Sequence, residues 1–130
     1  MKLHITIICC FLLCINAKSQ SIEKVTAKDA FEVVINRDTA ITIIIDGRSD
    51  EMYANKHIEG AINIYAFSDS LKTELKNYLE AKNIIVYCTN HKRAELIIEK
   101  LKEFQYNGKI IFITDGINAW VSSGYKTVSN

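Results

Sequence analysis

The stretch "NIIVYCTNHKRAELIIEKLKEFQYNGKIIFIT", residues 83 to 114, decides the fold of this chain. It begins with an apolar, β-branched run, 83 to 88, and ends with a second such run, 109 to 114. Between them, apolar residues recur at helical spacing from Arg93 to Gln105, and we expect Asn107-Gly108 to end that helix. A buried strand, a helix and another buried strand in succession are typical of a parallel sheet covered by helices.

The same alternation continues outward on the N-terminal side of this stretch. In "KVTAKDAFEVVIN", 24 to 36, a stripe of apolar residues predicts a helix, and Thr26 with Asp29 forms a capping box at its start. "AITIIID", 40 to 46, predicts a third strand buried on both faces. The remaining predicted elements are a short helix at 50–55, a short strand at 61–65, a helix within 68–82, and a turn with a short helix at 115–124.

Apolar strands that alternate with helices predict an α/β fold of three layers, with a central, mainly parallel sheet flanked by helices on both faces. The length of 130 residues suits one domain, and 48% apolar with 24% charged residues is ordinary for a globular protein. The formal net charge of +1 gives no general argument for nucleic-acid binding. We expect a monomer.

The N-terminus differs from the rest. Lys2 precedes an unbroken apolar run from Ile5 to Ile15, which is followed by the small-residue pattern Ala17-Lys18-Ser19. The run is too short to span a bilayer comfortably as a helix, so we predict a signal peptide over 1–19 and no membrane span after its removal. A buried N-terminal helix is one alternative, and the absence of a polar face in the run argues against it. A lipoprotein anchor is the other, and the residues before the three cysteines, Ile8, Cys9 and Leu13, are not the small residue that a lipidation site needs.

Removal of this leader would leave one cysteine, because Cys9, Cys10 and Cys14 lie inside it. Cys88 would then have no partner for an internal disulfide, and the net charge would become −1. A lone thiol in an exported protein indicates reactivity or intermolecular pairing. The predicted location is secreted or periplasmic.

Cys88 stands at the carboxyl end of a predicted buried strand, directly before a helix. Ligands of parallel α/β sheets bind at that edge. Unpaired N–H groups at the helix start, together with His91, Lys92 and Arg93, would favour a thiolate, and Arg93 could bind an oxyanion through a bidentate fork. This predicts a nucleophilic cysteine beside an anion pocket. A buried structural cysteine is an equally good interpretation of the local stretch alone.

Four separate motifs decide between these interpretations. They stand in order along the chain and are "IIIDGRS" at 43–49, "HIEGAINI" at 57–64, "VYCTNHKRA" at 86–94 and "DGINAW" at 115–120. In this combination the chain resembles a single-domain member of the rhodanese superfamily, and the resemblance places the rhodanese-like domain at 22–128.

The resemblance implies a sulfurtransferase of the thiosulfate sulfurtransferase type. Cys88 would attack the outer sulfur of thiosulfate or a persulfide donor, carry it as a persulfide, and pass it to cyanide or a thiol, including that of a thioredoxin-like protein. No metal or organic cofactor is expected. The residues implied to bind the substrate or cradle the persulfide anion are Thr89, Asn90, His91, Lys92 and Arg93. Asp46, Arg48 and His57 are implied to support the site, and Trp120 to pack beneath the loop.

Two residues depart from the family pattern. His91 stands where the loop usually has glycine, and a positive φ there would strain a histidine, so the loop is expected to be either strained or differently shaped. His91 would then lie either in the pocket, as a cation or proton donor, or exposed on the loop. Asp115 stands where a glycine is common, which is tolerable in a turn.

Two other functions remain as alternatives. One is a catalytically weak binding or regulatory module of the cell envelope, against which Cys88 and Arg93 argue. The other is a cysteine phosphatase or arsenate reductase. Loops of that class place five residues between cysteine and arginine, whereas four stand here.

Overall fold

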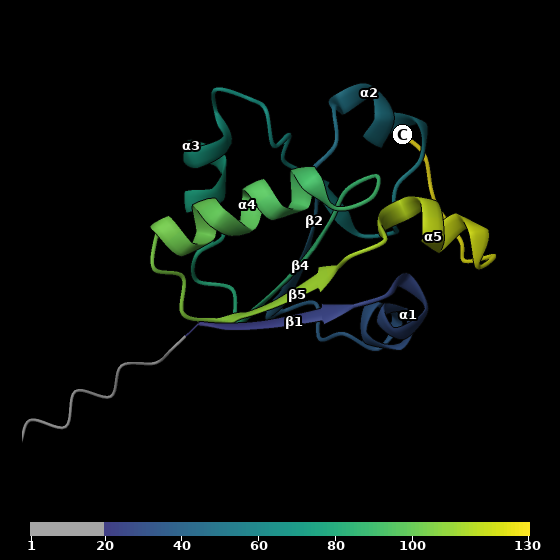
Figure 1. Ribbon diagram of the computed structural model, residues 1–130, viewed down its shortest axis with the longest axis horizontal. Helices are drawn as coiled ribbons and strands as arrows, with labels where there is room; N and C mark the ends of the chain where they lie inside the picture. Colours follow the sequence, from purple (N-terminus) through teal and green to yellow (C-terminus); the bar gives the residue numbers. More distant parts are fainter. Residues whose placement is uncertain (1–19) are drawn as a thin grey trace, which may run out of the picture.

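The computed structural model describes residues 20–130 (Figure 1). The signal peptide predicted for 1–19 lies outside the described residues. Five strands form one parallel sheet in the order β1-β5-β4-β2-β3. The strands are β1 (Ser21–Val25), β2 (Thr42–Asp46), β3 (Ala61–Asn63), β4 (Asn83–Tyr87) and β5 (Lys109–Ile113). The helices are α1 (Ala27–Ile35), α2 (Asp50–Asn55), α3 (Leu71–Lys76), α4 (Lys92–Glu103) and α5 (Gly116–Ser122).

The helices form a layer on each face of the sheet, as the sequence predicts. Side chains of β4 alternate between the two faces: Ile84 and Val86 join the core beneath α3 and α4, while Ile85 and Tyr87 join the core beneath α1 and α5. In Figure 1, α3 and α4 lie above the sheet, α1 lies below it, and α2 and α5 lie toward the strands' carboxyl ends. No helix between residues 20 and 130 has both the length and the apolar character needed to cross a bilayer.

The start of the domain differs from the prediction. Residues 21–25 form the edge strand β1, and the helix expected from residue 24 begins at Ala27. β1 carries exposed charged residues, and its Glu23 forms an ion pair with Lys109 of β5 at 2.7 Å. Charged side chains on an edge strand discourage pairing with other chains, but they also hide the apolar pattern of a strand. One half of the predicted capping box is present: the Thr26 side chain accepts a hydrogen bond from the Asp29 N–H at 3.2 Å, while among residues 20–130 the Thr26 N–H makes no bond to the Asp29 carboxylate.

The end of α4 also differs from the prediction. The helix ends at Glu103, and Gln105 rather than the Asn107-Gly108 pair takes the left-handed conformation, with φ of 55°. The N–H of Tyr106 bonds to the carbonyl of Leu101 at 3.0 Å, and the N–H of Gln105 bonds to the carbonyl of Lys102 at 2.9 Å. These two bonds make a Schellman motif with a non-glycine residue at its left-handed position.

Helix α3 is shorter than its apolar stripe suggests. It ends at Lys76, and the chain continues through turns, yet Tyr78 and Leu79 still pack against the core. Helical spacing therefore marked which side chains are buried more reliably than it marked the length of the helix.

The buried phenol of Tyr106 is expected to make stability fall at alkaline pH. Burial raises the pKa of Tyr106 to about 12, and its hydroxyl donates to the Ala81 carbonyl at 2.7 Å. Between pH 10 and 12 the folded protein therefore retains a proton that the unfolded chain loses, so the free energy of unfolding falls by about 2 kcal/mol over this window. Urea unfolding of wild type and Tyr106→Phe at pH 8, 10 and 12 measures this. A variant with the same alkaline slope as wild type would contradict it.

Candidate functional site

Cys88 directly follows β4, which lies between β5 and β2 in the middle of the sheet. The residue is only 1% exposed and belongs to the core cluster beneath α3 and α4. Cys88 also lines a hollow of about 440 Å³, so a residue of the core borders a space that is open to solvent. The other residues that line this hollow are Phe67, Thr89, Asn90, His91, Lys92 and Arg93.

The loop after Cys88 has many unused hydrogen-bond donors. Among residues 20–130, no acceptor pairs with the backbone N–H groups from Thr89 to Arg93. The N-terminus of α4 has no side-chain cap, because its N-cap residue His91 makes no such bond. Free donors at a helix start, with the positive end of the helix dipole, favour a bound anion.

His91 shows no strain. Its φ is −141°, so the position occupied by glycine in the usual family loop does not require the left-handed region here. Of the two alternatives for the loop, strain at His91 is not observed, and a loop of different shape agrees with this φ. Its side chain is half exposed, and Nδ1 lies 3.4 Å from Oε1 of Glu95 one turn further along α4. The half-exposed side chain and its contact with Glu95 fit the exposed loop histidine, and His91 also lines the hollow at Cys88.

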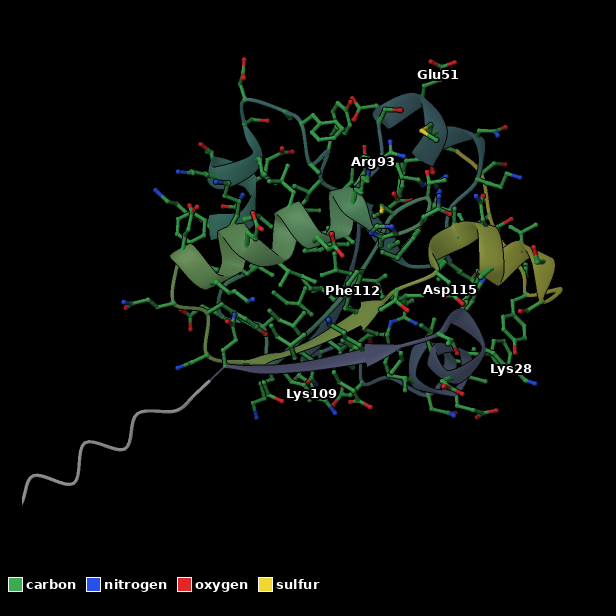
Figure 2. The ribbon with its side chains drawn as sticks, viewed as in Figure 1. Lys28, Glu51, Arg93, Lys109, Phe112 and Asp115 are labelled. Atoms are coloured by element: carbon green, nitrogen blue, oxygen red, sulfur yellow. The ribbon has the colours of Figure 1, made fainter. Side chains whose placement is uncertain are left out.

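The Arg93 side chain bonds back to the start of the loop. Its Nη2 donates to the Thr89 hydroxyl oxygen at 2.7 Å, and its Nη1 lies 3.5 Å from the sulfur of Met52 on α2. Figure 2 shows Arg93 at the start of α4, on the side facing α2. One arm of the guanidinium fork is thus already bound within the loop. Lys92 is exposed and makes no ion pair with any described residue.

Helix α5 holds the other side of the loop. The N–H of Ile117 donates to the Cys88 carbonyl at 2.9 Å, and the N–H of Asn118 donates to the Thr89 carbonyl at 3.4 Å. Gly116 begins α5 with φ of +64°, and a Cβ added there would lie 2.3 Å from the Thr89 carbonyl oxygen and 2.5 Å from that of Cys88. Only glycine allows this close approach without a shift of the backbone.

A buried ion pair supports the carboxyl edge of the sheet. Asp46 ends β2, and its carboxylate accepts from Nε and Nη2 of Arg48, with the closest contact at 2.8 Å. Arg48 Nη2 also donates to the Lys56 carbonyl at 2.6 Å, which ties the end of α2 to the sheet. Burial lowers the pKa of Arg48, but the hydrogen bonds and charge of Asp46 outweigh burial and raise it. Burial, followed by the charge of Asp46, raises the pKa of Tyr87 in the adjacent strand.

His57 lies in the connection between α2 and β3. Its Nδ1 bonds to the Tyr53 carbonyl at 2.8 Å, and its ring stacks on Tyr53 with centroids 3.8 Å apart. Its backbone pairs with Val128 in an antiparallel bridge. Neither His57 nor Asp46 lines the hollow at Cys88, whereas Arg48 lines a neighbouring cleft. These contacts hold the chain around the site.

Asp115 and Trp120, both in the motif at 115–120, contact residues far away in the sequence. The Asp115 carboxylate accepts from the Ala27 N–H at 2.7 Å and so caps α1, a contact across 88 positions of sequence; Figure 2 shows Asp115 between α5 and α1. Trp120 is buried as predicted, but it packs with Phe31 and Tyr125 in the core beneath α1 and α5, on the face opposite Cys88.

Sequence reasoning missed Phe67, Met52 and Asn118. Phe67 is 63% exposed and lines the hollow at Cys88, Met52 contacts Arg93, and Asn118 bonds to the loop through its backbone. For Phe67, the available signal in the sequence was a large apolar residue in a segment without hydrophobic periodicity. Within residues 20–130, no group of three or more His, Cys, Asp or Glu side chains is arranged so that it could hold a metal ion.

Solved structures with the same fold include several rhodanese-related proteins. A rhodanese-related protein from Thermoplasma volcanium is 22% identical with a TM-score of 0.68, over 83% of this chain and 99% of that one. A thiosulfate sulfurtransferase from Pseudomonas aeruginosa is 18% identical with a TM-score of 0.67, over 83% of this chain and 20% of that one. A Rhodopseudomonas palustris protein described as a possible tyrosine phosphatase is 20% identical with a TM-score of 0.63, over 82% of this chain and 85% of that one. At these identities the likeness shows the fold alone.

No curated protein is similar enough in sequence to be matched. The family model for the rhodanese-like domain matches residues 28–123. This match spans most of the chain and includes Cys88, its loop and α5. The chain belongs to the rhodanese-like domain family.

Proposed function

We propose that this protein is a sulfurtransferase that carries sulfur as a persulfide on Cys88. One observation carries the proposal: Cys88 lines an open hollow at the start of a loop whose backbone N–H groups, Thr89 to Arg93, have no acceptor among the described residues. A purely structural cysteine needs neither the hollow nor the free donors. A persulfide anion needs both, because its terminal sulfur must be reachable and its charge must be stabilised.

In the loading step the Cys88 thiolate attacks the outer sulfur of thiosulfate. A sulfur–sulfur bond forms on Cys88 while the sulfur–sulfur bond of thiosulfate breaks, and sulfite leaves with that electron pair. The negative charge is then on the terminal sulfur of the persulfide, which the free N–H groups from Thr89 to Arg93 can stabilise. The charge is conserved, and no oxidant or reductant is needed.

In the discharge step an acceptor attacks that terminal sulfur. Cyanide would leave as thiocyanate, and a thiol would leave as a persulfide, with the Cys88 thiolate restored in both cases. We propose a thiol as the acceptor, either a small molecule or a thioredoxin-like protein. The exposed Lys92 would attract anionic donors toward the hollow.

The Arg93 guanidinium has a positioning role in this proposal. Its bond to the Thr89 hydroxyl spans the loop, and we expect this bond to hold the N–H groups in place around the terminal sulfur of the persulfide. The four residues between Cys88 and Arg93 make a loop shorter than a phosphatase loop needs for a tetrahedral oxyanion. This spacing favours sulfur transfer over phosphoryl or arsenate chemistry on the same fold.

Mass spectrometry of the purified protein tests the proposal. After incubation with thiosulfate, or separately with glutathione persulfide, we expect a gain of one sulfur atom that cyanide removes. Peptide mapping locates the added sulfur, since Cys9, Cys10 and Cys14 are also present in the full chain. Cys88→Ser is the matched control and should gain no sulfur at position 88.

The contrary result is also well defined. If Cys88 reacts with iodoacetamide but takes up sulfur from neither donor, its thiol is accessible and the transferase proposal is wrong. A binding module would then be the better explanation of the retained loop.

A further inference from the structure

We propose that a cavity on the face of the sheet opposite Cys88 binds a free α-amino acid with an apolar side chain. This inference is independent of the proposed sulfur transfer. The space, which we name the Trp120 cavity, has a volume of about 400 Å³, within the range of small-molecule sites. Its lining residues are Phe31, Val34, Ile35, Arg37, Ile58, Glu59, Trp120 and Lys126.

The Trp120 cavity is separate from the site at Cys88. No residue between 20 and 130 lines both this cavity and either the hollow at Cys88 or the cleft at Arg48. Val34, Ile58 and Trp120 belong to the core beneath α1 and α5, whereas Cys88 belongs to the core on the other face. The helices α1 and α5, which carry most of the lining, pack against each other (Figure 1). A ligand in this cavity would therefore not compete with a sulfur donor.

Part of the cavity wall is apolar and rigid. Val34, Ile58 and Trp120 are each at most 3% exposed, so core packing holds them in place. The indole Nε1 of Trp120 donates to the Lys126 carbonyl at 2.9 Å, and the ring packs against Phe31 with centroids 5.9 Å apart. A wall of this kind suits an aromatic or branched aliphatic side chain, whose removal from water favours binding.

The cavity also contains a cation that is held in position. Arg37 Nη1 donates to the Val34 carbonyl at 2.5 Å, and Nη2 donates to the Glu59 carbonyl at 3.4 Å. Gly60 leaves room for this guanidinium, because a Cβ at residue 60 would lie 2.2 Å from Nη2. The remaining N–H groups of Arg37 have no acceptor among residues 20–130, so they are available to the carboxylate of a ligand.

Charges of both signs line the cavity. Arg37 and Lys126 are cationic and Glu59 is anionic, and none of the three forms an ion pair with any residue from 20 to 130. Arg37 and Glu59 do not pair with each other, although the guanidinium reaches the Glu59 backbone carbonyl. An α-amino acid carries a carboxylate and an ammonium on one carbon atom, so it can match both signs of charge at once. A carboxylate without an ammonium would leave Glu59 unmatched.

The fluorescence of Trp120 measures binding directly, since Trp120 is the single tryptophan of the chain and lines the cavity. Three probes are titrated separately into the purified protein: L-phenylalanine, 3-phenylpropionate, which lacks the ammonium, and 2-phenylethylamine, which lacks the carboxylate. We expect saturable binding of L-phenylalanine. We expect about fivefold weaker binding of 3-phenylpropionate and about tenfold weaker binding of 2-phenylethylamine, because each lacks one of the two charged contacts.

Neutral variants of the charged residues assign these contacts. Glu59→Gln should abolish the preference for L-phenylalanine over 3-phenylpropionate, whereas Arg37→Gln should weaken the binding of both about tenfold. Because Arg37→Gln also loses two bonds to carbonyl groups, Lys126→Gln at an exposed position is the second variant, with binding about threefold weaker. Lys28→Gln is the matched control: Lys28 is an exposed cation of α1 that does not line the cavity, and its loss should leave the affinity unchanged (Figure 2).

Three results would each overturn the inference. The first is no saturable change in Trp120 fluorescence with L-phenylalanine up to its limit of solubility. The second is equal affinity for the three probes, which would mean that the cavity recognises the apolar group without the charges. The third is an affinity for L-phenylalanine that equals that of wild type in both Arg37→Gln and Lys126→Gln. None of these results bears on sulfur loading of Cys88, which is measured without an amino acid present.

Discussion

Replacing Arg48 by methionine is expected to lower the free energy of unfolding by about 3–5 kcal/mol. Asp46 is fully buried, and the substitution removes its cationic partner together with the hydrogen bonds from Nε and Nη2. A buried carboxylate without a partner cannot recover the hydration that it loses on folding. The bond from Arg48 to the Lys56 carbonyl would also be lost, which frees the end of α2. Urea unfolding followed by the fluorescence of Trp120, the single tryptophan, measures the change.

The double variant Asp46→Asn with Arg48→Met is the control for this prediction. The asparagine side-chain oxygen introduced at position 46 can still accept a hydrogen bond from the backbone N–H of residue 48, a bond of 2.9 Å in the native protein. The double variant leaves no unpaired charge. We expect the double variant to be more stable than Arg48→Met alone, because the two effects are coupled in one pair. If the two variants have the same free energy of unfolding, the destabilisation by Arg48→Met arises from lost packing and not from the unpaired charge of Asp46.

Replacing Gly116 by alanine is expected to slow sulfur loading of Cys88 by about a hundredfold. The new Cβ would meet the carbonyl oxygens of Thr89 and Cys88 at 2.3 Å and 2.5 Å, and backbone atoms cannot rotate away as a flexible side chain can. Relief requires α5 and the loop to separate, which breaks the bond from Ile117 to the Cys88 carbonyl. The N–H groups proposed to hold the persulfide would then be displaced. Single-turnover loading with thiosulfate, followed by mass spectrometry, gives the rate.

Gly124→Ala separates this clash from backbone strain. Gly124 also has a positive φ, +81°, but nothing lies within 4 Å of the added Cβ. Both variants share the left-handed strain of about 1 kcal/mol, and only Gly116→Ala should slow the loading. If the two variants load at the same rate, the close packing of α5 on the loop has no part in the activity.

Much of the fold was predictable because burial leaves a local pattern. The central strands are apolar on both faces and read as continuous runs, and the stripe on α4 marks the face that packs on β4. The edge strand β1 was missed because its five residues, "SIEKV", are mostly exposed and carry charges. The end of α4 was misplaced because Gln105 is not a residue that sequence rules associate with a left-handed turn.

The candidate site also has features that the sequence predicts and features that it does not predict. That Cys88 ends a central strand and precedes a helix follows from the sequence, since the carboxyl ends of parallel strands share one edge. The absence of strain at His91 did not follow, because a residue type restricts φ without fixing it. The roles of Met52 and Phe67 did not follow either, since both come from segments distant in sequence.

The sequence by itself determined the α/β class, the family and the position of the one cysteine between residues 20 and 130, because periodicity and motifs are local properties of the chain. Only the tertiary structure decided the strand order, the approach of Gly116 to the Cys88 carbonyl, the cap that Asp115 gives α1, and the cleft that adjoins the loop. The physical reason is that these features depend on contacts between residues far apart along the chain. Such contacts are fixed by how whole elements pack, and they leave no periodic signal in the sequence around either partner.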